Sequence, residues 1–425
     1  MSAAKFLGRH GMLASRIDPD RELSRFLEEM NRVRSGGYGS LKMIPAFLGE
    51  YRAPEGREKV IVIDIGGTNI RASIVEMGPE GMLSSLPLEP FLTPGLDGEI
   101  DSDTFFRRIA DGVSSQDAWQ QVTAKTGSKL GICFSFALNH SKDRDAEVAY
   151  GAKQINVPDL VGRKIGDSFR KALRDLGRPA EQKITVINDA VAAALGGYSL
   201  PSEKQYSGYL GFIYGTGTNL SYCTRHGEII NVESGAYCSF PSGDIDDVYD
   251  RSLIDAGQDR FEKMVSGGYQ KGLANCILRY AAQEGELSST AWRALHDHDA
   301  AGLNPKEISI FMNDPLGEGI IARSCESPED RIFLVELFDL LTKRSALLCS
   351  ITITAALLQA EAGSDPDRPA FITAEGSTFS KQKGFREKLY SAMDSLAGQK
   401  HGLHYEFHTV PDVILRGSAV ACMSA

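Results

Sequence analysis

The stretch Val60–Val75, "VIVIDIGGTNIRASIV", is an apolar run that small and polar residues interrupt before it resumes in alternation. The continuous β-branched part, Val60–Ile65, is typical of a strand buried on both faces, and the alternation from Ile70 onward is typical of a second strand. The two glycines between them do not fit a P-loop or a dinucleotide-binding fingerprint, because in both of those the glycine loop opens a helix. The stretch therefore predicts strand, glycine-rich turn and strand, a turn whose backbone N–H groups can approach a phosphate closely. A plain hairpin closed by Gly-Gly is the alternative.

A second stretch, Tyr209–Cys223, repeats this pattern as "YLGFIYGTGTNLSYC". An apolar strand again leads into a glycine- and threonine-rich turn that ends in asparagine, and a strand follows. Two such hairpins favour two related lobes, each offering a phosphate-binding turn across a shared cleft. An accidental pair of glycine-rich hairpins is the weaker interpretation.

Length and composition set limits on the class of protein. The chain has 425 residues, of which 42% are hydrophobic and 24% charged, so two large domains or lobes are expected. The formal net charge of -10 gives no overall field that attracts nucleic acid or an acidic membrane. The seven cysteines are scattered and show no zinc-ligand spacing, which predicts reduced thiols in the cytoplasm rather than a disulfide framework.

No segment of the sequence is typical of a membrane anchor. The N-terminal residues lack a sustained apolar core of the signal-peptide kind. The strongest apolar run, Ser345–Ala360, is shorter than a bilayer span and rich in serine and threonine, so a buried helix is expected there.

Between the two hairpins lies Ile184–Ser199, "ITVINDAVAAALGGYS", which predicts a buried strand followed by an alanine-rich helix. Asn188 and Asp189 stand at the junction, where either residue could serve as the helix N-cap. A carboxylate at the carboxyl end of a strand, facing a cleft between two phosphate-binding turns, also suits a group that deprotonates an attacking hydroxyl in phosphoryl transfer. We therefore expect Asp189 to be catalytic, with helix capping as the alternative.

These motifs carry a family resemblance. The first hairpin, "VINDAVAAAL", the second hairpin and a late "ITAEGS" (Ile372–Ser377) resemble, in order, the phosphate-1, connect-1, phosphate-2 and adenosine motifs of the actin-like ATPase superfamily. More narrowly, the chain resembles the eukaryotic-type hexokinases and glucokinases. The narrower match rests on "GSLKMIPAFL" (Gly39–Leu48), "FSFALNH" (Phe134–His140), "YGAKQIN" (Tyr150–Asn156), "NVESGAY" (Asn231–Tyr237) and "AGQDRFEKMVSGGY" (Ala256–Tyr269).

The resemblance implies an α/β fold of the two-lobed actin-like ATPase (ribonuclease H-like) type, with a cleft between a small and a large domain. The implied small domain comprises residues 52–188 plus 413–425, and the implied large domain comprises residues 1–51 plus 189–412. The implied activity is ATP-dependent phosphorylation of the 6-hydroxyl of glucose or a related hexose. The implied ligands are the hexose, ATP and magnesium, and the oligomeric state is not given.

The resemblance also implies roles for individual residues. Asp189 corresponds to the general base for the sugar hydroxyl, and Lys153 offers positive charge near the transferring phosphoryl group. Asp64 corresponds to the magnesium-holding residue, through water. The implied hexose-binding residues are Ser135, Lys153, Asn188, Asp189, Asn219, Glu233 and Glu262. The implied nucleotide- and phosphate-binding residues are Asp64, Gly66, Gly67, Thr68, Asn69, Arg71, Gly215, Thr216, Gly217, Gly267, Gly376 and Ser377.

The chain departs from the family pattern at several places, some of them beside the implied sugar pocket. Ala137 stands where the family has proline, and Gly151-Ala152 precede Lys153 where the family has Trp-Thr. Ser234 replaces a tryptophan, and Val413-Ile414-Leu415 replace the Gly-Ser-Gly that opens the last helix. A different hexose, fructose or mannose, is therefore the alternative substrate, and a weakly catalytic sugar-sensing protein is the alternative function. An assay for ADP release with glucose present distinguishes an active kinase from such a sensor.

Overall fold

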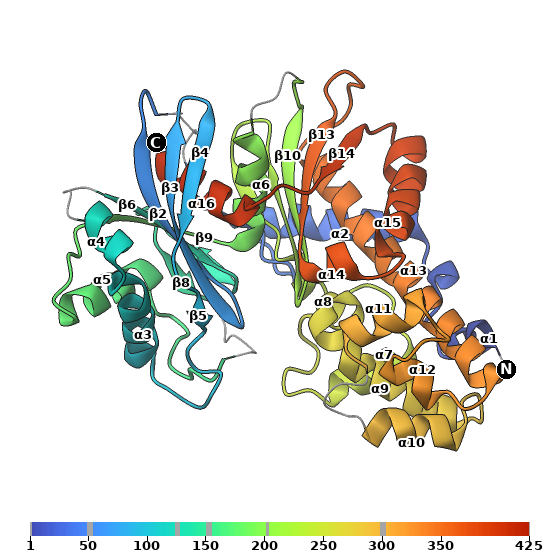
Figure 1. Cartoon of the computed structure of the whole chain (residues 1–425). Helices are drawn as coiled ribbons and strands as arrows, with labels where there is room; N and C mark the ends of the chain where they lie inside the picture. Colours follow the sequence, from blue (N-terminus) through green and yellow to red (C-terminus); the bar gives the residue numbers. More distant parts are fainter. Residues whose placement is uncertain are drawn as a thin grey trace.

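The computed structural model describes residues 2–48, 54–123, 128–149, 155–200, 204–297 and 303–424. Two β-sheets lie in separate α/β lobes, and two helices run between them (Figure 1). The sheets contain the two hairpins that the sequence predicts. Each hairpin turn faces the space between the lobes.

The first sheet has the strand order β4-β3-β2-β6-β9, and β5 pairs with the end of β3. Strand β2 pairs antiparallel with β3 and parallel with β6, which in turn pairs parallel with β9. The predicted strands at Val60–Ile65, Ile70–Ile74 and Ile184–Ile187 are thereby confirmed. The bounds are Glu58–Ile65 (β2), Asn69–Gly78 (β3), Gly81–Pro87 (β4), Phe91–Leu92 (β5), Lys129–Phe134 (β6) and Lys183–Ile187 (β9), beside a small hairpin of Leu138–His140 (β7) and Ala146–Val148 (β8).

Both faces of this sheet are buried, as the continuous apolar run of β2 predicts. Ile61 and Ile63 face helices α3 (Ser102–Ser114), α4 (Asp117–Thr123) and α5 (Ile165–Asp175) in one apolar cluster. Val60 and Val62 point the other way, into a cluster with helices α6 (Asp189–Tyr198) and α16 (Val413–Met423). The alternation of side chains along the strand thus supplies two cores from one segment.

The second sheet has the order β1-β12-β11-β10-β13-β14. Strands β10 and β11 form the second predicted hairpin, and β13 extends the sheet as a parallel neighbour of β10. Helices α2 and α13 cover one face of this sheet, and α6 contacts its strands from the other. The bounds are Ile44–Pro45 (β1), Gly208–Tyr214 (β10), Thr218–Cys223 (β11), Ile229–Asn231 (β12), Ala370–Glu375 (β13), Tyr405–His408 (β14), Pro19–Arg34 (α2) and Pro328–Gln359 (α13).

The remaining helices belong to the larger lobe, and several pack around their own apolar cluster at the amino-terminal half of α13. Their bounds are Ala3–Arg9 (α1), Asp244–Arg251 (α7), Arg260–Val265 (α8), Gly267–Gln283 (α9), Ser289–Asp297 (α10), Pro305–Asn313 (α11), Ile320–Ser324 (α12), Ser377–Lys381 (α14) and Phe385–Met393 (α15), with 3-10 turns at Ala14–Arg16 and Ser234–Ala236 and a π-helical segment at Asp394–Lys400.

The apolar run at Ser345–Ala360 lies within or directly after α13 and is mostly buried, so the prediction of a buried helix is confirmed. Among the described residues, no helix combines the length and the apolar character needed to cross a bilayer. All seven cysteines are free thiols, as the sequence predicts.

Helices α6 and α16 cross between the two sheets with backbone against backbone (Figure 1). A Cβ atom placed on Gly417 would lie 1.8 Å from the carbonyl oxygen of Ala192, so only glycine permits this approach. Helix α16 also contacts β2 and β6, and α6 contacts β10 and β11. The crossing therefore joins the two sheets, although the limits proposed for the two domains remain a prediction.

We expect Gly417→Ala to lower the free energy of unfolding by about 2 kcal/mol, because the added methyl group forces the helices apart and this strain exceeds the gain in helix propensity. Urea denaturation measures the change. Gly56→Ala is the matched control, since a Cβ atom there meets nothing within 4 Å, and it should alter stability by no more than about 0.5 kcal/mol. Equal stabilities for the two variants would contradict the close crossing.

Candidate active site

A cavity of about 440 Å³ opens between the two sheets. The β2–β3 turn, the end of β6, the β9–α6 junction, the β10–β11 turn, α8 and the β13–α14 junction all contribute to its wall. It therefore brings together segments that are distributed along most of the chain. The predicted site residues that line it are Asp64, Gly66, Gly67, Thr68, Arg71, Ser135, Asn188, Asp189, Gly215, Thr216, Gly217, Asn219, Glu233, Glu262, Gly376 and Ser377.

Three predicted residues are not part of this wall. The side chain of Asn69 is exposed and donates a hydrogen bond to the Thr68 hydroxyl at 3.1 Å. Gly267 begins α9 behind the second turn, and its N–H donates to the carbonyl of Gly215 at 2.9 Å. Lys153 lies outside the described residues, so its predicted role stays a prediction.

Hydrogen bonds from neighbouring segments fix both glycine turns. Thr93 is buried beside the first turn, where its hydroxyl donates to the carbonyl of Gly66 at 2.8 Å and its N–H donates to the carbonyl of Thr68 at 3.1 Å. In the second turn, the carbonyl of Gly215 accepts from the Thr378 hydroxyl at 2.8 Å. Because these bonds engage turn carbonyls from behind, the two turns present fixed backbone to the cavity.

Asp189 lines the cavity as the first residue of α6. The N-cap is the preceding residue, since the Asn188 side chain accepts from the N–H of Ala190 at 2.9 Å. One oxygen of Asp189 also contacts this N–H at 2.8 Å. Capping therefore does not require Asp189, and the alternative interpretation of this residue loses its main argument.

The environment of Asp189 favours the protonated carboxyl. Burial raises the pKa of Asp189 to about 6, and the nearby charge of Asp64 adds to this effect. The Ala190 N–H and the hydroxyl of Ser135 act against it by hydrogen bonding to the carboxylate. A carboxyl with a pKa near neutrality is well matched to accepting a proton from a hydroxyl group.

Asp64 lies at the end of β2, where it is 5% exposed. Burial raises the pKa of Asp64, and Arg71 opposes this by an ion pair of 2.8 Å between its guanidinium and a carboxylate oxygen. Most of the Arg71 side chain remains exposed to the cavity region. The pair thus offers both a carboxylate and a cation beside the first glycine turn.

The oxygen donors beside this turn suit a hard cation such as Mg²⁺. Asp64, Asp189 and Glu375 are carboxylates of the cavity wall, and magnesium in proteins takes one or two carboxylates together with waters and phosphate oxygens. Among the described residues, no three His, Cys, Asp or Glu side chains are grouped as a ready-made metal cage. A magnesium ion here would therefore depend on ligands that arrive with it.

The opposite wall carries two more predicted carboxylates. A Glu262 oxygen accepts from the N–H of Thr218 at 3.1 Å, and a Cβ atom on Gly217 would lie 2.6 Å from that oxygen. The glycine of the second turn therefore makes room for Glu262. Glu233 has a left-handed backbone with φ of 52°, and burial raises the pKa of its carboxyl to about 7.

The cavity wall includes residues that the sequence did not identify. Asp259 and Glu375 add carboxyl groups, and burial raises the pKa of Glu375. Asp259 precedes the predicted residue Glu262 by three positions, and Glu375 directly precedes the predicted Gly376. Their place next to predicted residues in the sequence was therefore a signal that could have identified them. Ile414 belongs to the departure Val413-Ile414-Leu415 that the family resemblance had singled out, although it was not among the predicted site residues. Ala137, the departure that the sequence places beside the implied sugar pocket, also lines the wall, and the remaining unpredicted wall residues are Phe136, Ile213, Thr218, Gly235 and Ala236.

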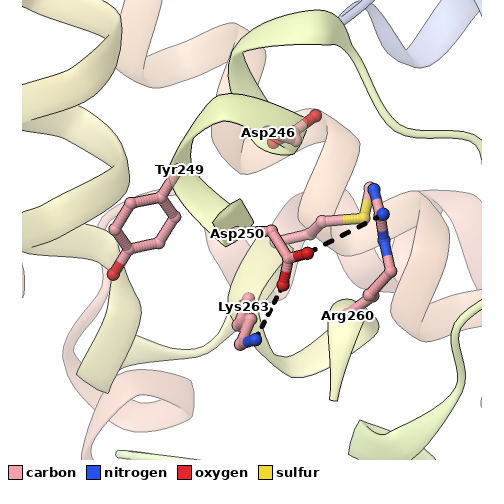
Figure 2. Close-up of a pocket in the computed structure, with 6 residues that line it drawn as sticks. Asp246, Tyr249, Asp250, Arg260 and Lys263 are labelled. Carbon is pink, nitrogen blue, oxygen red and sulfur yellow. Dashed lines mark hydrogen bonds and ion pairs between the residues drawn. The ribbon is translucent and has the colours of Figure 1, made fainter. Parts of the chain in front are cut away.

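An ion cluster joins Lys263 and Arg260 of α8, the helix that carries Glu262, to Asp250 of α7 (Figure 2). Lys263 is 3% exposed and its ammonium contacts Asp250 at 2.7 Å and Asp255 at 3.1 Å. Arg260 approaches Asp250 at 3.9 Å and also pairs with Asp247. These contacts attach the six-residue helix α8, which carries Glu262, to α7.

Two lobes whose glycine turns face one cleft define the two-lobed actin-like ATPase fold, and solved structures share it. The hexokinase from Schistosoma mansoni complexed with glucose superposes with a TM-score of 0.81 over 100% of both chains, at 18% identity. A ROK family glucokinase from Streptomyces griseus in complex with glucose and AMPPNP gives 0.51 over 85% of this chain and 98% of that one, at 17% identity. The predicted fold class is confirmed.

The family follows from the sequence itself. Two family models described as hexokinase match residues 20–198 and 209–424, and the chain belongs to the hexokinase family. Rat hexokinase-2 is 25% identical over 407 residues, which cover 88% of this chain and 43% of the relative. Hexokinase-2 of Saccharomyces cerevisiae is 23% identical over 413 residues, covering 88% and 81%. The chain thus spans less than half the length of the rat relative, and the predicted family is confirmed.

We expect Lys263→Met to lower the free energy of unfolding by roughly 3 kcal/mol, because it leaves a buried carboxylate with less compensation. Thermal or urea unfolding at neutral pH gives the value. Lys306→Met removes an exposed lysine of α11 and serves as the control, with an expected change of no more than about 0.5 kcal/mol. A loss below about 1 kcal/mol for Lys263→Met would show that the cluster does not hold α8 in place.

Proposed function

We propose that the chain is an ATP-dependent hexokinase that transfers the terminal phosphoryl group of ATP to the 6-hydroxyl of glucose or a related hexose. The main support is the position of Asp189, a carboxyl with a raised pKa in the wall of a cleft between two glycine turns. Since Asn188 caps the helix, Asp189 remains available for chemistry. The family membership and the glucose bound in the two solved kinase structures support the same reaction.

In this proposal Asp189 removes the proton from the sugar hydroxyl as the oxygen attacks phosphorus. Ser135, whose hydroxyl bonds to that carboxylate, orients it. Glu233 and Glu262 accept hydrogen bonds from other sugar hydroxyls across the cleft, and Asn188 and Asn219 complete the wall between them. Carboxylates and amides at fixed positions suit a ligand that presents only hydroxyl groups.

The two glycine turns bind the phosphates of ATP in the proposal. Thr68 and Thr216 add hydroxyl donors to the backbone N–H groups of these turns, and Arg71 adds positive charge. Asn69 is also proposed to contact the phosphates. The nucleoside is proposed to lie against the β13–α14 junction at Gly376 and Ser377, with Gly267 nearby. Lys153 is proposed to face the transferring phosphoryl group.

Asp64 is the residue proposed to hold magnesium through water, with Glu375 within the same wall. When bound with ATP, magnesium supplies positive charge that neutralises the phosphate oxygens. The position of Asp64 in the cleft wall beside the first glycine turn supports this assignment. Cytoplasmic location without membrane or nucleic-acid partners is part of the proposal, and the free thiols support the reducing compartment.

Glucose is the first substrate to test, with fructose and mannose as alternatives. Ala137 and Ile414 both line the cleft, so two of the departures from the family pattern contact the space that ligands occupy. A panel of hexoses with purified protein and Mg-ATP distinguishes them.

We expect Asp189→Asn to lower kcat by roughly 10²- to 10⁴-fold, the usual contribution of a general base. ATP affinity should stay near the parent value, because the phosphate turns are separate from α6. The folded state should be retained, since Asn188 provides the cap. Coupled detection of ADP with hexose present measures kcat, and a folded variant with the parent rate would refute the catalytic role of Asp189.

The pH dependence follows from two carboxyls that must be ionised to accept hydrogen bonds and protons. The pKa of Glu233 is raised to about 7 and that of Asp189 to about 6. As the pH falls through this range, both carboxylates become protonated, and Asp189 can then no longer accept the proton of the sugar hydroxyl. We expect kcat/KM for the hexose to decline below pH 7 and to fall more steeply below pH 6. Initial rates between about pH 5 and pH 9 measure this profile. A rate that stays constant down to about pH 5 would contradict the assignment.

A further inference from the structure

A chain of three asparagine side chains lies beneath the carboxylates proposed to bind the sugar. Asn219 donates to the side-chain oxygen of Asn188 at 3.2 Å and to that of Asn231 at 3.0 Å. Asn231 in turn donates to a carboxylate oxygen of Glu233 at 2.7 Å, and the Asn219 amide also reaches that oxygen, at the longer distance of 3.3 Å. The chain therefore runs from the N-cap of α6, beside Asp189, to Glu233 on the other wall.

Asn231 is the member of this chain that has no contact with the cleft. It is fully buried, at 0% exposed, and its backbone is paired in the sheet with Ser221 on one side and Ile44 on the other. Its side-chain oxygen accepts from Asn219, which turns the amide so that the NH₂ group faces Glu233. An aspartate could accept in the same way but has no N–H to donate.

Glu233 needs such support because its position is unfavourable in two respects. Its backbone lies in the left-handed region, with φ of 52°, where residues other than glycine are uncommon. The carboxyls that face it are Asp189 from α6, Glu262 from α8 and Asp259 at the N-cap of α8. Burial and these charges raise its pKa, whereas the Asn231 hydrogen bond lowers it.

We propose that Asn231 is a positioning residue of the sugar pocket, whose amide holds the Glu233 carboxylate toward the cleft, where it can accept a hydrogen bond from the hexose. The role in sugar binding rests on the proposed function. The coupling between Asn231 and Glu233 does not, because it follows from the two side chains alone.

The first experiment measures the coupling without any ligand. The free energy of unfolding is determined by urea between about pH 4 and pH 9 for the parent and Glu233→Gln, and again with Asn231→Leu in both backgrounds. A carboxyl with a raised folded pKa stabilises the folded state below its unfolded pKa, and this stability is lost as the pH rises through the folded pKa. The difference curve is the free energy of unfolding of the parent minus that of Glu233→Gln, plotted against pH. It should therefore level off near pH 7 when Asn231 is present. In the Asn231→Leu pair it should level off about one unit higher.

The second experiment measures the consequence for the sugar. Asn231→Leu should raise KM for the hexose by about ten-fold at neutral pH and move the acid limb of kcat/KM upward by about one unit, with KM for ATP unchanged. Asn231→Ser fits the same strand, but its side chain is too short to reach Glu233. It should give the same changes, and it replaces the leucine variant if that variant does not fold. Asn275→Leu, a part-buried amide of α9 outside the cleft wall, is the control and should leave both profiles unchanged.

The outcomes separate the two claims. If the difference curve levels off at the same pH in both Asn231 variants as in the parent, the coupling is overturned. If the curve shifts but KM for the hexose and the acid limb of kcat/KM do not change, the role in sugar binding is overturned. A parent protein that neither binds nor phosphorylates any hexose overturns the proposed function, while a shifted difference curve still supports the coupling.

Discussion

The close crossing of α6 and α16 at Gly417 and Ala192 determines where the parts of the site meet. Helix α16 packs on β2 and β6 of one lobe, and α6 packs on β10 and β11 of the other. Because the N-terminus of α6 carries Asp189, a change in this crossing would move the proposed base relative to both glycine turns. The proposed chemistry thus depends on a contact that involves no functional side chain.

Local sequence patterns were sufficient for the elements on which the cleft is built. The apolar runs of β2 and β10 and the glycines after them predicted both hairpins, since strand burial and turn conformation are encoded over a few neighbouring residues. The sequence left the role of Asp189 open between capping and catalysis. The structure assigns the cap to Asn188 because only the tertiary setting fixes which side chain turns back to the helix.

The residues that escaped prediction depend on contacts between distant segments. Asn231 lies in a strand of three residues, and its importance arises from pairing with β1 and from reaching Glu233 and Asn219. Ile414 reaches the cleft only because the C-terminal helix returns between the sheets. Both residues lie in stretches that the family resemblance had singled out, Asn231 in "NVESGAY" and Ile414 in Val413-Ile414-Leu415. No local pattern, however, indicates which distant side chains each of them contacts.

The cleft concentrates carboxyl groups in a way that opposes stability and favours ligand binding. Burial raises the pKa of Asp64, Asp189 and Glu233, which means that each of them is held away from water without full compensation. Ligand hydroxyl groups that donate hydrogen bonds, and a cation that accompanies phosphates, provide the missing compensation. Amides such as Asn231 supply part of it in advance, and this keeps the acceptors oriented before a ligand arrives. The same uncompensated charge that weakens the fold is therefore what a polyhydroxylated ligand and its phosphate donor would bind.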